Sequence, residues 1–272
     1  MLFSWWKNRR RRRWLAQRQP AIWDAWLRAN VWQYAHLEPR LQRRVTEFVC
    51  IFLKEKHWVG CRGFKLTDEM RVTIAGQAAL MTLGFEQPYY FDRLKSILVY
   101  PNTFQSRPNT TDELFLGRYN EPQFGADPRL GESWRGGPII LSWKSVLQDG
   151  RHRRLRRSVV LHEFAHQMDG LDGDTDGTPP LTSFRFQERW SQVTSREYQR
   201  LVQFARRDRD TLLDQYGATN KAEFFAVATE CFFTAPHEFA DQHHDLYAVL
   251  CELFGQDPRE WLPDQPEREA AG

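Results

Sequence analysis

Residues 158–169, SVVLHEFAHQMD, decide the fold of this chain. They contain the pattern His162-Glu163-x-x-His166, and the apolar residues around it predict a single buried α-helix. Because an α-helix turns about 100° per residue, the two histidines would lie one turn apart on the same face. Two imidazole nitrogens at that spacing can both reach one Zn²⁺ ion at about 2.0–2.1 Å. The motif alone is incomplete, since catalytic zinc needs a third protein ligand and an open fourth position.

The glutamate inside this motif has a chemical use of its own. Glu163 follows the first histidine, where its carboxylate can accept a proton from a water molecule that a metal activates. The helix is apolar around most of its girth, so it must be buried. Unpaired polar groups in a core are costly, and a metal ion would give these side chains a partner. We therefore predict a catalytic site with one Zn²⁺ per chain.

Length and composition predict a substantial core. The chain has 272 residues, of which 41% are hydrophobic, with 11 tryptophans and 19 phenylalanines. Its four cysteines form no Cys-x-x-Cys pair and are expected to be buried free thiols. No run of 18 apolar residues occurs, and the apolar part of the first residues is too short for a secretory signal. We expect a cytoplasmic protein without a transmembrane segment.

The basic residues gather at one end. Residues 1–20 hold seven of the positive charges and no acid, so the remainder of a chain of net charge +3 carries −4. Trp5, Trp6 and Trp14 lie among them. The favoured interpretation is a solvated, poorly ordered tail, the usual state of terminal charge blocks. A membrane-surface contact and a nucleic-acid contact are the functional alternatives. Because nothing resembles a DNA-reading module, we expect no direct nucleic-acid binding.

We predict a single domain over residues 21–255, between the basic tail and a C-terminal tail at 256–272. Residues 21–90 would be its helical scaffold and 91–255 its catalytic part. In the scaffold, apolar residues recur every three or four positions between residues 21 and 57. Thr67 is the expected N-cap of a further helix that ends at Gly84.

Two strands are predicted before the histidine helix, over residues 95–101 and 137–143. The residues between them, rich in Asn, Pro and Gly, are expected to form loops around a short strand at 114–116. The second strand could accept an extended peptide along a free edge, or it could be an ordinary sheet strand. After the histidine helix, the acidic residues 172–176 predict a polar loop rather than a calcium site, and residues 184–208 predict a helix.

A second apolar helix, expected within residues 216–233, offers the missing ligand. It begins near Thr219 or Asn220 and carries two acids, Glu223 and Glu230. Apolar neighbours on both sides of Glu223 place its face inside the protein, so we prefer it to Glu230 as the third ligand. Asp169, near the end of the histidine helix, could orient a histidine or could simply be a helix-end residue.

These residues together resemble the Mlc titration factor A family of bacterial zinc metallopeptidases, also called the glucose-regulated metallopeptidases. The resemblance extends from about residue 20 to about residue 255, and its motifs are specific in combination. The matching stretches are LTDEMRV at 66–72, SILVYP at 96–101, GESW at 131–134, LSW at 141–143, VLHEFAHQ at 160–167 and YGATNKAEFFA at 216–226.

The last stretch is also similar to the catalytic domain of anthrax lethal factor, where a Tyr-Gly segment precedes an Ala-Glu-Phe-Phe-Ala helix. This similarity implies that Glu223 is the third zinc ligand and that Tyr216 stabilises the transition state. One departure is Val227, which stands where lethal factor has an acid.

The family resemblance implies a helix-rich α+β fold of the zincin type, with a small sheet and a central helix bearing the histidines. It further implies aminopeptidase-like activity on peptide substrates and binding to the glucose repressor Mlc. The alternative function is that of a regulatory protein that sequesters such a repressor, with peptidase activity secondary or latent. A zinc-stabilised structural module is disfavoured, because a structural site has no use for the base Glu163.

Overall fold

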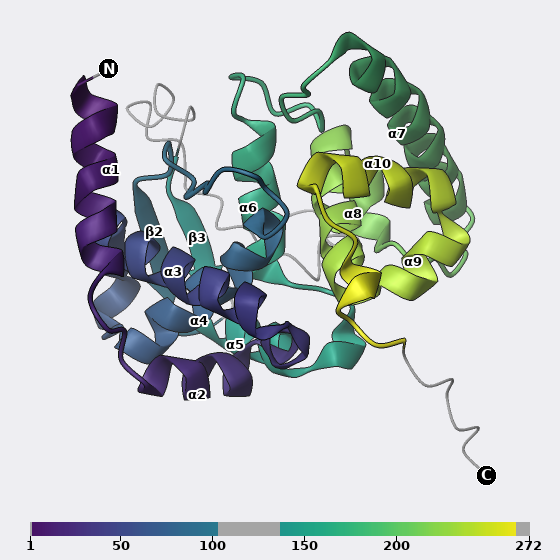
Figure 1. The fold of residues 1–272 in the computed structure, drawn as a ribbon. Helices are drawn as coiled ribbons and strands as arrows, with labels where there is room; N and C mark the ends of the chain where they lie inside the picture. The colour runs from purple at the N-terminus through teal and green to yellow at the C-terminus, as the bar shows by residue number, and fades with distance from the viewer. Residues whose placement is uncertain (1, 103–136, 265–272) are drawn as a thin grey trace.

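The computed structural model of the chain describes residues 2–102 and 137–264. In Figure 1, α1 to α5 and the strands gather on one side of the central helix α6, and α7 to α10 on the other. The helices are α1 (Leu2–Leu15), α2 (Ile22–Asn30), α3 (Pro39–Glu55), α4 (Asp68–Ala79), α5 (Trp143–Arg151), α6 (Val159–Asp169), α7 (Phe184–Ala205), α8 (Lys221–Thr234), α9 (Pro236–Gln242) and α10 (His244–Phe254). The strands are β1 (His57–Gly60), β2 (Ser96–Tyr100) and β3 (Ile139–Ser142). The expected helix-rich α+β architecture is confirmed.

The three strands form one parallel sheet in the order β1-β2-β3. Strands β2 and β3 confirm the two predicted strands, and β3 pairs on one side with β2. Strand β1 was missed, because its four residues directly follow the helical pattern of α3 and are only half-buried. The strand predicted at 114–116 lies outside the described residues.

The expectation of a poorly ordered tail at the start of the chain is wrong, since residues 2–15 form helix α1. The guanidinium of Arg11 donates to both carboxylate oxygens of Glu55, at 2.9 and 2.7 Å, and to Asp92 at 2.6 Å. The same guanidinium lies 4.3 Å from the centre of the Tyr90 ring. Lys7 adds an ion pair with Asp92 at 2.8 Å. Helix α1 is therefore held by residues far away in the sequence.

Helix α4 begins after the N-cap residue that the sequence predicted. The hydroxyl of Thr67 accepts the N–H of Met70 at 3.3 Å, which caps the helix. A short 3-10 turn, η3 (Leu80–Thr82), continues it towards Gly84. A side chain at Gly84 would meet the carbonyl oxygen of Phe254 at 2.3 Å, so the close approach of α10 requires glycine there.

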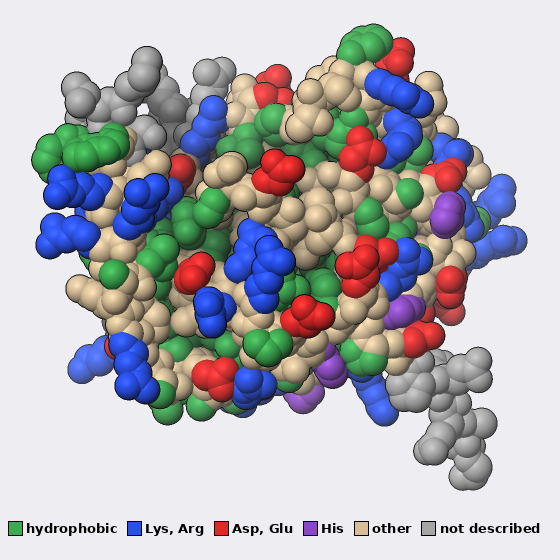
Figure 2. Space-filling view, in the orientation of Figure 1, with side chains coloured by type: hydrophobic (Ala, Val, Ile, Leu, Met, Phe, Trp, Pro, Cys, Tyr) green, Lys and Arg blue, Asp and Glu red, His purple; other side chains and the backbone are tan. Residues whose placement is uncertain are grey.

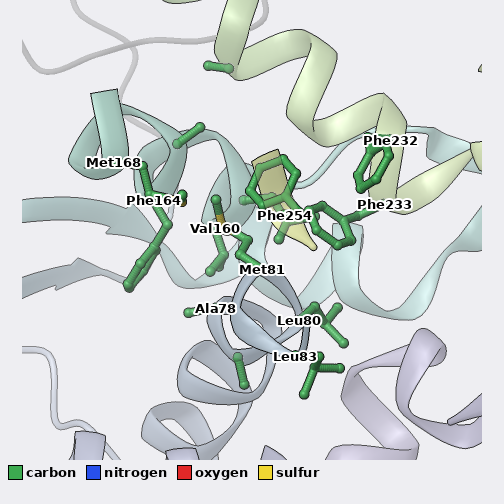
Figure 3. Packing of buried hydrophobic residues seen from close by; sticks show 14 of the residues in the cluster. Ala78, Leu80, Met81, Leu83, Val160, Phe164, Met168, Phe232, Phe233 and Phe254 are labelled. Atoms are coloured by element: carbon green, nitrogen blue, oxygen red, sulfur yellow. The ribbon is translucent and has the colours of Figure 1, made fainter. Parts of the chain in front are cut away.

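Helix α6 is packed from several sides, as its composition predicts. Figure 3 shows Val160 of α6 close to Met81 of η3, with Phe254 beside it and Phe164 and Met168 further along α6. The ring of Phe164 meets that of Phe91 edge to face, with centroids 4.7 Å apart. The two histidines of α6 are therefore held on a rigid element inside the core.

All four cysteines are free, as expected, although Cys61 and Cys251 are only partly buried. Within the residues that the structure describes, no helix is both long enough and apolar enough to cross a membrane. Figure 2 shows charged side chains of both signs spread over one face of the molecule.

Candidate metal centre

The first turn of α6 is fixed by groups from α5 and α8. The Ser158 hydroxyl caps the helix by accepting the N–H of Leu161 at 3.3 Å. The N–H of Ser158 donates to Glu230 at 2.7 Å, and that of Val159 donates to Asp149 at 3.1 Å. Burial raises the pKa of Asp149 to about 6. These two carboxylates lie at the positive end of the helix dipole, where negative charge is stabilising.

Helix α8 lies against α6 and supplies the facing acids. Its N-cap is Asn220, whose side-chain oxygen accepts the N–H of Glu223 at 2.9 Å, which decides between the two predicted cap residues. Glu223 and Glu230 are seven residues apart, so they lie two turns apart on nearly the same face of the helix. Both are buried, which agrees with the prediction for Glu223, but Glu230 is buried more deeply, so burial does not decide between the two as ligands.

Three of the predicted site residues come together between these helices. Nε2 of His162 lies 3.0 Å from Oε2 of Glu223 and 3.2 Å from Nε2 of His166. Nε2 of His166 lies 3.5 Å from the same carboxylate oxygen. Among the described residues, this is the one group of histidine, cysteine and acidic side chains whose ligand atoms converge closely enough for a metal ion.

The spacing of these three atoms fits a metal. Ligand atoms of a tetrahedral zinc site, bound at about 2.0–2.1 Å, lie roughly 3.3 Å apart from one another. The observed separations of 3.0, 3.2 and 3.5 Å surround that value. Oε2 of Glu223 is also buried without a hydrogen bond among the described residues. Burial would raise the pKa of this carboxyl, but the two histidines lower it to about 2, so it is an anionic ligand.

Glu230 lies on the other side of the His162 ring. Its Oε1 lies 2.8 Å from Nδ1 of His162, while its Oε2 accepts the N–H of Ser158. Nδ1 of His162 is therefore placed to donate to Glu230, which leaves Nε2 as the ring atom directed at Oε2 of Glu223 and Nε2 of His166. Burial disfavours a charged imidazole, but Glu223 and Glu230 outweigh it and raise the pKa of His162.

From its sequence, Glu230 was predicted only as a rival ligand, and its contact with Nδ1 of His162 was not predicted. The signal that could have revealed it is the seven-residue spacing of the two acids on α8, which places both carboxylates along one helix, two turns apart.

Glu163 and Tyr216 border the same histidine. Glu163 is half-buried on α6, beside His162 in the sequence. Tyr216 lies in the 3-10 turn η5 (Gln215–Ala218), with its ring centre 6.1 Å from that of His162. Its backbone N–H donates to Asp214 at 3.0 Å, which fixes the turn. The structure thus places the Tyr216 ring beside His162, while Glu163 follows His162 on the same helix.

Asp169 has a different contact. It accepts the N–H of Gly177 at 2.9 Å, in the loop after α6, and burial raises its pKa to about 6. This contact favours the interpretation of Asp169 as a helix-end residue. Gly177 has φ +83, and a side chain there would meet the carbonyl oxygen of Lys221 at 2.3 Å, so the loop lies directly against the start of α8.

The three ligands of the cluster differ in exposure, and His166 is the most accessible. The side chain of His162 is 3% exposed, that of Glu223 is 11% exposed and that of His166 is 16% exposed. A site with three protein ligands and one accessible side can accept a further ligand, as catalytic metal sites do and structural sites do not.

Comparison with known proteins adds an independent observation. The model of the family described as glucose-regulated metallo-peptidase M90 matches residues 5–255. The chain belongs to the M90 family. An uncharacterized protein of Synechocystis is 37% identical over 88% of this chain and 85% of its own length. Proteins named Mlc titration factor A are 30% identical, over 82% of both chains in Klebsiella pneumoniae and over 88% and 87% in Cronobacter sakazakii.

Membership of M90 confirms the predicted family and gives the activity class, a metal-dependent peptidase. The family implies a metal cofactor, and the cluster of His162, His166 and Glu223 is the candidate site for it.

Proposed function

We propose that this M90 protein is a zinc-dependent peptidase of zincin type, with one Zn²⁺ per chain held by His162, His166 and Glu223. The observation that carries the proposal is the convergence of their three ligand atoms, 3.0–3.5 Å apart, at the contact between two core helices. A peptide would approach the metal from the side of His166, which is the most exposed of the three ligands at 16%. Aminopeptidase-like specificity rests on the family resemblance alone.

When bound, zinc supplies Lewis acidity, which polarises a peptide carbonyl and lowers the pKa of water. Glu163 accepts the proton of the attacking water and transfers it to the leaving amine. The hydroxyl of Tyr216 donates a hydrogen bond to the carbonyl oxygen as negative charge develops there. Glu230 keeps the proton on Nδ1 of His162 and fixes the orientation of the ring.

The test is to measure zinc content and peptide hydrolysis for the wild type and for Glu163→Gln. Loss of the base should lower kcat by about 10²–10⁴-fold while zinc is retained. Glu188→Gln, which changes an exposed glutamate of α7, is the matched control and should leave both quantities unchanged. Peptides with free and with acetylated amino termini separate aminopeptidase from endopeptidase activity. A zinc-loaded wild type that cleaves no peptide of a broad panel would rule out the proposal.

A second candidate function is binding of an Mlc-type transcription repressor, which would place the protein in the cytoplasm. It is favoured by the name of the relatives, Mlc titration factor A. The two functions are separable by measuring the affinity of a purified Mlc-type repressor for the wild type, for Glu163→Gln and for zinc-stripped protein. Equal affinity in all three would show that binding does not depend on peptidase chemistry.

A further inference from the structure

Helix α1 has an inward and an outward face. Arg11 and Lys7 on the inward face form the ion pairs that hold the helix against α3 and the segment after α4. The side chains on the outward face, hereafter the α1 face, are exposed, and they are Trp5, Trp6, Asn8, Arg9, Arg10, Arg12 and Arg13. Figure 2 shows hydrophobic side chains next to Lys and Arg at the edge where α1 lies in Figure 1.

The two tryptophans of the α1 face are unusual for a protein surface. Trp5 is 54% exposed and Trp6 is 62% exposed, and their rings touch edge to face with centroids 5.4 Å apart. Adjacent exposed indoles leave a large apolar area in water, which is typical of an interaction site. Arg11 is bound between the carboxylates of Glu55 and Asp92, so α1 is fixed in place and its outward face points to solvent.

The arginines of the α1 face leave positive charge available to a partner. Within the described residues, Arg9, Arg12 and Arg13 form no ion pair, and Arg10 reaches Glu55 only at 3.9 Å. Arg9 and Arg10 lie over the rings of Trp5 and Trp14, at 5.3 and 4.9 Å, which leaves their charge uncompensated. The basic run at residues 206–209, by contrast, is interleaved with Asp208 and followed by Asp210. The uncompensated charge of the α1 face therefore favours an anionic partner.

We propose that the α1 face binds the surface of an anionic phospholipid bilayer. Along the α1 face, Trp5 and Trp6 precede the arginines, and the guanidinium of Arg9 lies 5.3 Å from the centre of the Trp5 ring, so apolar and basic groups share one surface. Indole rings prefer the boundary between headgroups and acyl chains, while arginines bind lipid phosphates. A nucleic-acid surface would instead present open ring faces on which bases stack, whereas the Trp5 ring is covered by Arg9 and meets Trp6 edge to face.

The test is flotation of the full chain with vesicles of phosphatidylcholine alone and of phosphatidylcholine mixed with phosphatidylglycerol. Binding should require phosphatidylglycerol and weaken with salt. Changing Arg9, Arg10, Arg12 and Arg13 to Ser should weaken it about 100-fold or more, at about fivefold per arginine. Trp5→Ser combined with Trp6→Ser should weaken it about tenfold.

The matched control changes four other exposed arginines, Arg185, Arg206, Arg207 and Arg209, to Ser and should keep wild-type binding. Circular dichroism and thermal unfolding confirm that each variant is folded. Equal affinity of the wild type for both vesicles, or full binding by the variant without the four arginines of the α1 face, would overturn the proposal. So would band shifts with duplex DNA or RNA in the absence of flotation, which would assign the face to nucleic acid.

Discussion

Two regions of the molecule depart from the usual distribution, in which polar side chains lie on the surface and apolar side chains lie inside. They are the contact between α6 and α8 and the outward face of α1, and they depart from it in opposite directions. In the first, imidazoles and carboxylates lie inside an apolar core, with His162 and Glu230 almost fully buried. In the second, Trp5 and Trp6 are more than half exposed among arginines. Buried polar groups and exposed apolar groups both cost free energy in an isolated chain. Each region therefore indicates a ligand, a metal ion in the core and a lipid surface outside.

The two regions also differ in how their side chains are held. In the core, buried polar groups position one another, as Glu230 positions His162 at 2.8 Å. On α1, only the inward residues are fixed, and the outward arginines remain free of close ion pairs among the described residues. Substitutions in the core should therefore change chemistry sharply, whereas substitutions on the α1 face should change binding in graded steps.

The largest effect among the supporting residues is expected at Tyr216. Tyr216→Phe removes a hydroxyl that would donate to the developing oxyanion, so kcat should fall about 10²–10³-fold. The KM and the zinc content should stay close to those of the wild type, because the ring remains beside His162. Steady-state kinetics with a chromogenic peptide measure this. A variant with wild-type kcat would exclude Tyr216 from the reaction.

A smaller effect is expected for Glu230→Gln. In the wild type, the two oxygens of Glu230 each face one donor, Nδ1–H of His162 and the N–H of Ser158. A glutamine offers one acceptor oxygen, so one donor loses its partner. Zinc affinity, measured by competition with a chelator, should fall about 10–100-fold. Unchanged affinity would mean that Glu230 does not position His162, and Glu188→Gln serves as the control.

The sequence predicted those features that are encoded locally. The caps at Thr67 and Asn220, the helix of residues 158–169 and strands β2 and β3 each depend on side chains within a few residues. The pairing of the two histidines with Glu223 was also predictable, because both helices carry polar side chains that their apolar surroundings would otherwise exclude.

The features that were missed depend on contacts between distant residues. Arg11 and Glu55 are 44 positions apart, so the charge block at the start of the chain gave no sign that it would dock as a helix. Glu230 and His162 are 68 positions apart, and only the packing of α8 on α6 shows that this acid binds Nδ1. Strand β1 is four residues long and is defined by its neighbour β2 rather than by its own pattern.

The smallest effect is expected where α1 docks. Arg11→Met removes the hydrogen bonds to Glu55 and Asp92, so the buried Glu55 carboxylate loses these partners. The free energy of unfolding should therefore fall by about 1–3 kcal/mol. The exposed neighbour Arg12 provides the control, since Arg12→Met should change stability by less than about 0.5 kcal/mol. Urea unfolding of the two variants measures the difference, and equal stabilities would show that α1 is not held by Arg11.

The central claim is that Glu223 completes the metal site that the two histidines of α6 begin. It is tested most directly by measuring the zinc content of purified wild type, Glu223→Ala and Glu230→Gln at saturating zinc. We predict about one zinc per chain in the wild type and in Glu230→Gln, and none that survives a desalting column in Glu223→Ala. Retention of about one zinc per chain by Glu223→Ala would contradict the account.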